Sequence, residues 1–169
     1  MASKRTAVPP ENPESLYRMP GHLIRRCHQI AVALFLEETA AFGITPQQYA
    51  TLAVLAMNDG VDQITLAGLA AFNRTTAGEV LGRMETAGLV TRSDSATDGR
   101  VKTIRITRAG RKLLADVQDA IERVQERLLV PLNAAERRQF TEFLARIASE
   151  NNELSRAPLR RPAARSAAD

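Results

Sequence analysis

Residues 64–107 contain two helical patterns, a glycine that ends the second helix, and two strand-like segments, one directly after another. Thr65 is a suitable N-cap for a short helix over residues 66–72, in which apolar residues recur on one face. A second helix follows, and Gly88 stands where a left-handed residue ends a helix. Residues 89–93 and 100–106 then read as the strands of a hairpin with a charged tip. This order predicts a winged helix-turn-helix, a device that places one helix in a DNA major groove.

Two N-caps are compatible with the second helix of this motif. Asn73 precedes its first turn, whereas Thr76, with Glu79 three residues later, has the spacing of a capping box. The other role open to Glu79 is to accept a hydrogen bond from a cytosine amino group. Of these two roles for Glu79, we favour the cap.

The wing carries an excess of positive charge. Residues 92–112 contain seven basic residues and two acids, whereas the whole chain has a formal charge of only +4. The basic residues are Arg92, Arg100, Lys102, Arg105, Arg108, Arg111 and Lys112, and the acids are Asp94 and Asp98. Such an excess beside a helix-turn-helix is typical of proteins that bind the phosphate backbone. The alternative is a solvated hairpin with ordinary surface arginines.

The wing resembles the D-x-R…L-T-x-x-G signature of the multiple antibiotic resistance regulator (MarR) family in Asp98, Arg100, Thr107 and Gly110. The preceding run RMETAGLVTR resembles the family's R-L-E-x-x-G-L-V-x-R segment. The resemblance extends over nearly the whole chain without its tails, from about residue 22 to residue 151. It implies a sequence-specific, DNA-binding transcriptional regulator.

The resemblance also implies roles for individual residues. Arg100 corresponds to the wing-tip arginine that enters the minor groove, and Asp98 to the acid that helps to fix it. Residues 75, 76 and 78 would face the major groove, and Arg74 would lie near phosphate. The predicted DNA-binding residues are Arg74, Thr75, Thr76, Gly78, Arg83, Asp98, Arg100 and Lys102.

Long helical patterns flank the motif. One helix is predicted over residues 21–42 and ends at Gly43, and Thr45-Pro46-Gln47-Gln48 has the N-cap, proline and capping-box glutamine that open the next. After the wing, Thr107 caps a helix that runs to about residue 129. Pro131 breaks it, and Asn133 with Glu136 begins the last helix.

These terminal helices carry more apolar surface than a lone winged helix can cover, which predicts a two-fold homodimer on pseudo-palindromic, double-stranded operator DNA. The resemblance implies the same. The predicted fold is mainly α with a small β wing, a winged helix-turn-helix whose long terminal helices form the dimer. The predicted boundaries are 1–15 for a disordered N-terminal tail, 16–45 and 108–152 for the dimerisation region, 46–107 for the DNA-binding domain, and 153–169 for a disordered basic C-terminal tail.

Residues 22–29 contain both histidines of the chain, its only cysteine and two adjacent arginines. Arginines near a helix N-terminus suit a carboxylate or phosphate ligand. The opening LIRRCHQIA resembles family members that answer to aromatic acids or their coenzyme A thioesters. The predicted ligand-binding residues are His22, Arg25, Arg26, His28, Gln29, Tyr49 and Thr51. The competing interpretation is salt bridges across the dimer, satisfied histidines and ordinary packing.

Cys27 is expected to be a buried structural thiol, with redox sensing as the alternative. A zinc site built from His22, Cys27 and His28 lacks a fourth ligand, and neither a metal nor another cofactor is predicted. No G-x-S-x-G motif or phosphate loop is present, so an enzyme is not expected.

The sequence therefore predicts a repressor that a small aromatic carboxylate or acyl-CoA releases from its operator. The alternatives are a redox-responsive regulator of the same fold that senses through Cys27, and a winged-helix module that binds protein. There is no long apolar run and no leader-like segment, so the chain is not expected to span a membrane or be targeted to one. The single cysteine excludes an internal disulfide, which fits a reducing cytoplasm.

Overall fold

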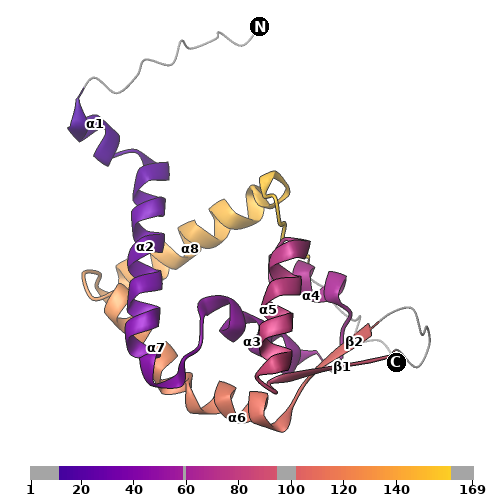
Figure 1. Ribbon diagram of the computed structural model, residues 1–169. Helices are drawn as coiled ribbons and strands as arrows, with labels where there is room; N and C mark the ends of the chain where they lie inside the picture. The colour runs from indigo at the N-terminus through magenta and orange to yellow at the C-terminus, as the bar shows by residue number, and fades with distance from the viewer. Residues whose placement is uncertain (1–11, 59, 95–101, 161–169) are drawn as a thin grey trace, which may run out of the picture.

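The computed structural model describes residues 12–58, 60–94 and 102–160 of the chain. Most of these residues are helical, and one small antiparallel sheet stands at an edge of the molecule (Figure 1). The elements in chain order are α1 (Pro13–Tyr17), α2 (Pro20–Glu38), the 3₁₀ helix η1 (Ala40–Phe42), α3 (Pro46–Met57), α4 (Gln63–Leu69), α5 (Arg74–Thr86), β1 (Val90–Asp94), β2 (Lys102–Ile106), α6 (Arg108–Asp116), α7 (Gln118–Leu128), α8 (Ala134–Glu150) and the 3₁₀ helix η2 (Asn152–Leu154). None of the helices in this described part is long and apolar enough to cross a membrane.

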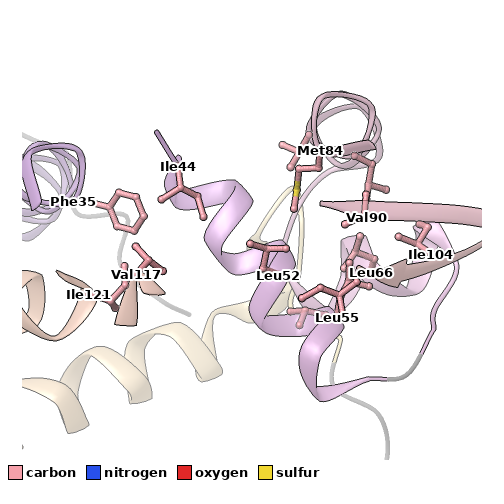
Figure 2. Close-up of a cluster of buried hydrophobic side chains, with 14 of the residues drawn as sticks. Phe35, Ile44, Leu52, Leu55, Leu66, Met84, Val90, Ile104, Val117 and Ile121 are labelled. Atoms are coloured by element: carbon pink, nitrogen blue, oxygen red, sulfur yellow. The ribbon is translucent and has the colours of Figure 1, made fainter. Parts of the chain in front are cut away.

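A single hydrophobic core runs through the molecule, and α3 connects its two ends (Figure 2). At one end, Phe35 of α2 lies near Val117 and Ile121. At the other end, α3 packs against the helix-turn-helix and the sheet. The side chains that are almost completely buried include Leu52, Leu55, Leu66, Leu81, Met84, Val90, Ile104 and Val117. Each such side chain contributes about 1.5–3 kcal/mol relative to an exposed one.

Helices α2 and α7 pack side by side, and an ion-pair cluster closes their contact at the end of α2. Arg123 Nε lies 2.8 Å from Glu38 Oε2, and Arg127 Nη1 lies 2.6 Å from Glu38 Oε1. The Glu38 side chain is only 13% exposed. Hydrogen bonds from Arg123 and then Arg127 lower the pKa of the Glu38 carboxyl.

The sheet has a fixed register, from Val90 opposite Ile106 to Asp94 opposite Lys102. A one-residue slip would turn the buried Ile106 outward, so the core holds this register in place.

Val61 extends the sheet on the free edge of β2. Its N–H donates to the Ile104 carbonyl at 3.2 Å, and the Ile104 N–H donates back at 2.8 Å. Gly60 precedes it with a φ of 79°, and a Cβ at Gly60 would lie 2.9 Å from Thr103 Cγ2. The position therefore needs glycine for both its conformation and its close approach to β2.

Several predicted helix ends are confirmed, but two predicted long helices are divided. The capping boxes of Thr45 and Asn133 are both present, and Thr107 caps α6. The helix predicted over residues 21–42 ends at Glu38, and η1 follows. The buried Thr39 hydroxyl donates to the Phe35 carbonyl at 2.7 Å, which helps to end the helix there. The helix predicted from Thr107 to residue 129 is α6 and α7, which meet at Val117 because α6 packs against α3 and α7 against α2.

Both predicted tails are shorter than expected. Asn12 caps α1 by accepting a hydrogen bond from the Ser15 N–H at 2.9 Å, so the prediction of disorder is wrong for residues 12–15. Residues 153–160 also have a defined fold, held by hydrogen bonds to Asn152 and Gly68. Residues 1–11 and 161–169 lie outside the described residues.

Candidate nucleic-acid interface

The first helix of the motif, α4, begins earlier than predicted because Asp62 caps it. Asp62 Oδ1 accepts hydrogen bonds from the N–H groups of Ile64 at 2.8 Å and Thr65 at 3.0 Å, and Oδ2 accepts one from the Thr65 hydroxyl at 2.6 Å. Burial acts to raise the pKa of Asp62, but these hydrogen bonds outweigh it and the pKa is lowered. Thr65 lies in the first turn, so its prediction as the N-cap is wrong.

Asn73 caps α5, the recognition helix. Its side-chain oxygen accepts a hydrogen bond from the Thr76 N–H at 2.8 Å, which decides between the two predicted caps. Glu79 lies in the second turn, too far from the cap to complete a box. Its Oε2 instead lies 3.8 Å from Arg83 Nη2, in an exposed ion pair. The capping role that we favoured for Glu79 is therefore wrong.

The two sides of α5 have different surroundings. Its inner side is buried against the core through Ala77, Val80, Leu81 and Met84. Its outer side exposes Arg74, Thr75, Glu79, Gly82 and Arg83. Three of the predicted DNA-binding residues, Arg74, Thr75 and Arg83, thus lie on the outward surface, and Thr76 is half-buried at its edge.

Gly78, also predicted to face the groove, lies at the contact between α4 and α5. A Cβ on Gly78 would be 3.2 Å from Gln63 Nε2, the group that donates to the Arg74 carbonyl at 3.4 Å. A side chain at this position would crowd the end of the Gln63 side chain, which bonds to the start of α5. This packing role is one that the sequence analysis did not identify.

Thr107 and Gly110, the two described residues of the predicted wing signature, join the end of α5 to the start of α6. The Thr107 hydroxyl donates to the Gly88 carbonyl at 2.8 Å and accepts from the Gly110 N–H at 3.0 Å. Gly88 has a φ of 70°, as predicted for a residue that ends a helix. A Cβ on Gly110 would lie 2.3 Å from the Leu89 carbonyl oxygen, which excludes any side chain there. Thr107 and Gly110 thus fix the base of the wing against the end of α5.

Comparison with known proteins agrees with this architecture. The family model for the MarR family matches residues 42–101. The transcriptional regulator HosA of Escherichia coli O157:H7 is 32% identical over 125 residues, which cover 71% of this chain and 92% of HosA. The chain belongs to the MarR family.

Two solved structures extend the similarity to this regulator's three-dimensional fold. PcaV of Streptomyces coelicolor, in complex with its natural ligand, superposes with a TM-score of 0.72 at 30% identity and covers 85% of this chain and 97% of PcaV. The transcriptional repressor CouR, bound to a 23-mer DNA duplex, superposes with a TM-score of 0.76 at 27% identity and covers 83% of this chain and 99% of CouR. The relatives are transcriptional regulators, and this chain is a transcriptional regulator of the same family.

Acidic residues reduce the positive charge of this regulator's wing. Arg92 Nε lies 3.3 Å from Glu85 Oε2, and Lys102 pairs with Asp94 across the sheet. Lys112 pairs with Asp116 one turn further along α6. Glu85 and Asp116 lie outside residues 92–112, so counting charges along the sequence overestimates the local excess. Asp98 and Arg100 lie outside the described residues, and their roles stay predictions.

The predicted ligand-binding residues fall into two groups on one chain. In the first half of α2, His22 lies beside Tyr17 with ring centroids 5.6 Å apart and tilted ring planes, and Arg25 Nη1 donates to Gln29 Oε1 at 2.9 Å. Arg26 and His28 are exposed in the same half of the helix.

The second group packs into the core. Tyr49 lies against Phe35, with ring centroids 6.1 Å apart, and Phe35 is about 15 Å along α2 from Arg25. Thr51 is fully buried and donates to the Gln47 carbonyl at 2.8 Å. Tyr49 and Thr51 thus pack in the core of one chain, at a distance along α2 from Arg25, and their role in ligand binding stays a prediction.

Cys27 is exposed on the single chain, so the prediction of a buried thiol is wrong there. Within residues 12–58, 60–94 and 102–160, no cluster of three or more His, Cys, Asp or Glu side chains is arranged to hold a metal ion.

Proposed function

We propose that this MarR-family regulator binds a pseudo-palindromic operator as a homodimer, and that a small aromatic carboxylate or acyl-CoA releases it. The observation that carries the proposal is the outward surface of α5. This surface presents Arg74, Thr75 and Arg83 on a helix whose opposite side is fixed in the core. A rigid, partly basic helix of this kind fits a major groove.

The apolar faces of α2 and α8 support the homodimer. Both helices carry large apolar side chains at helical spacing that remain between 41% and 49% exposed. On α2 these are Leu23, Ile24 and Ile30, and on α8 they are Phe143, Leu144 and Ile147. Exposed apolar surface of this extent is typical of a protein interface, and a second copy would cover both faces at once.

The base of the wing supports a second contact with DNA. The sheet ends at Asp94 and Lys102, from which the segment with Asp98 and Arg100 departs. In our proposal Arg100 enters the minor groove and Asp98 orients it. Thr76 and Gly78 lie beside the groove-facing surface, and Lys102 contacts phosphate.

The start of α2 supports the effector site. Arg25, Arg26 and His22 lie beside Leu23 and Ile24 of the proposed dimer face, so a partner subunit would complete a pocket with charged and apolar walls. Arginines there suit a carboxylate or a phosphate. PcaV, which is similar over most of this chain, binds a natural ligand. The effector would act by preferring one spacing of the two recognition helices, with a coupling free energy of ~1–3 kcal/mol.

The exposure of Cys27 supports a second candidate, redox control of the same DNA binding. Reversible loss of operator binding on mild oxidation, abolished in Cys27→Ser, is the result expected of that function.

The test of the proposed function is a fluorescence titration of the purified protein with DNA from upstream of its own gene, in rising salt, with and without aromatic acids. We expect binding that weakens steeply with salt and is released by an effector. Arg100→Ala should cost ~1–3 kcal/mol of binding free energy, whereas Arg138→Ala, an exposed arginine on α8, should cost little. Arg25→Ala or Arg26→Ala should reduce the response to the effector more than DNA binding. Equal losses of both would favour a structural role.

A further inference from the structure

The chain beyond α8 folds back onto the helix-turn-helix. After η2, residues 155–160 form a segment, here called the C-terminal strap, that reaches α4 (Figure 1). At its end the Arg160 N–H donates to the Gly68 carbonyl at 2.8 Å. Gly68 belongs to α4, the first helix of the motif, so the strap joins the last helix of the protein to its DNA-binding half.

A second set of contacts ties the end of the strap back to η2. The Asn152 side chain brackets Leu159, since its Nδ2 donates to the Leu159 carbonyl at 3.2 Å and its Oδ1 accepts from the Leu159 N–H at 2.8 Å. The guanidinium of Arg160 forms a two-point contact with the Glu153 carboxylate, at 2.5 and 2.9 Å. These contacts hold the last two residues of the strap against η2.

Gly68 provides the space that the strap needs. A Cβ at this position would lie 2.9 Å from Arg160 Cβ and 3.3 Å from Arg160 Cγ. The backbone of Gly68 is helical, and in a helix glycine is less favourable than alanine by ~1 kcal/mol. The helix itself gains nothing from a glycine here, whereas the close approach of the strap requires one.

The contact lies next to the turn that sets the direction of α5. Ala71, three residues after Gly68, has a φ of 52° and is the one non-glycine residue with positive φ in the described structure. Ala71 also lines a hollow of about 900 Å³, whose other walls include Ile147 of α8 and Leu159 of the strap. Residues in this conformation persist only where their surroundings hold them.

We propose that the C-terminal strap positions the DNA-binding half of the protein relative to α8. Held to η2 by Asn152 through Leu159 and seated on Gly68 through Arg160, it fixes α4 and the turn before α5, and operator affinity depends on this link. Gly68, Asn152 and Arg160 are thus positioning residues, because they act on DNA through α4 and not by touching it. The inference rests on the proposed operator binding by a dimer.

The test compares Gly68→Ala and Asn152→Ala with the wild type. The probe is a labelled duplex that the wild-type protein selects from a randomised library, and binding is measured by fluorescence anisotropy. Each variant should bind about tenfold more weakly, the loss expected from one or two hydrogen bonds. The double variant should lose little more than either single variant, because both release the same strap. Hydrogen exchange at Leu159, Arg160 and the amides of α4 should become faster in each.

Two matched controls separate positioning from other effects. Gly21→Ala makes the same substitution in α2, where an added Cβ has nothing within 4 Å in the described structure. Arg156→Ala removes a charge from the same strap at a side chain for which the described residues show no ion pair. Both should bind the duplex as the wild type does. An equal loss in Arg156→Ala would mean that the strap acts by its charge and would overturn the proposal.

The proposal is also overturned if exchange shows a released strap while affinity is unchanged. It fails equally if only Gly68→Ala loses affinity, since the damage would then be confined to α4. A wild-type protein that selects no duplex would overturn the proposed function. Wild-type binding with unchanged variants would overturn only the role of the strap.

Discussion

Helices α5 and α8 carry similar apolar patterns in the sequence but have opposite surroundings in the structure. Four of the thirteen residues of α5 are buried, whereas none of the seventeen residues of α8 is buried in the described chain. Phe143, Leu144 and Ile147 nevertheless recur on α8 at helical spacing. The difference shows that helical periodicity identifies an apolar face but not the molecule that covers it. The DNA-binding half has its core within one chain, whereas the outer helices leave an apolar face exposed that a second copy would cover in the proposed dimer.

The largest expected effect comes from replacing one leucine by alanine in each of these two halves. Leu81→Ala, at a fully buried side chain of α5, should lower the free energy of unfolding by ~2–5 kcal/mol. Leu144→Ala, at a side chain that is 41% exposed on α8, should act mainly through association of the subunits. Urea unfolding at several protein concentrations measures both. We expect the loss in Leu144→Ala to depend on concentration and the loss in Leu81→Ala not to. The same concentration dependence in both variants would contradict the division into two halves.

The next effect concerns the proposed dimer face of α8 directly. Ile147→Asp places a charge in the apolar stripe and should weaken dimerisation by ~2 kcal/mol or more, because the interface would bury that charge. Thr141→Asp adds the same charge about 120° around the helix and should have a smaller effect. Sedimentation velocity measures the populations of monomer and dimer. If both variants remain dimers as tight as the wild type, the partner covers a different face.

A smaller effect tests whether the DNA-binding half is held by its own helix caps. Asp62→Ala and Asn73→Ala should each cost ~1 kcal/mol of unfolding free energy, since each leaves N–H groups of a helix without an acceptor. Thr65→Ala removes only the hydroxyl that donates to Asp62 and should cost less. Thermal unfolding of the three variants gives the order. A loss in Thr65→Ala as large as that in Asp62→Ala would return the capping role to Thr65.

The smallest effect is the pH dependence of the contact between α2 and α7. Hydrogen bonds from Arg123 and Arg127 lower the pKa of Glu38 below its usual 4.5. A carboxyl of this kind stabilises the folded state fully above its unfolded pKa, and the contribution is lost as pH falls through the folded pKa. Wild-type protein should therefore lose more stability than Glu38→Gln on acidification below about pH 5. Glu126→Gln, at an exposed acid on α7, should follow the wild type, and parallel profiles for wild type and Glu38→Gln would contradict the prediction.

Much of the fold follows from local sequence signals. The capping boxes at Thr45 and Asn133 join residues three positions apart, so the sequence contains the whole interaction. The left-handed glycines at 43 and 88 are equally local. The outward position of Arg74 and Thr75 follows from the helical period once the start of α5 is known.

Two kinds of structural feature could not be predicted from the sequence. They are contacts between segments distant in the chain, and the choice between two neighbouring residues that could both cap a helix. Asp62 and Thr65 are both good caps, and only the start of α4 at Gln63 decides between them. The ion pair between Glu85 and Arg92 and the seat of the strap on Gly68 join separate elements. A composition rich in proline, alanine and arginine predicted disorder for residues 153–160. Composition does not reveal that these residues contact Gly68, which is distant in the sequence.

The number of residues around the bend at Val117 determines how α7 is rotated relative to α6 about the helix axis. Backbone hydrogen bonds continue through the bend, since Val117 donates to Leu113 and Ile121 donates to Val117, so α6 and α7 form one bent rod. Inserting one residue there would rotate one half against the other by about 100° and separate them by ~1.5 Å. Seven inserted residues would restore the azimuth to within about 20° but lengthen the rod by ~10 Å. In the proposed dimer, the number of residues in this rod would therefore affect the angle between the two recognition helices.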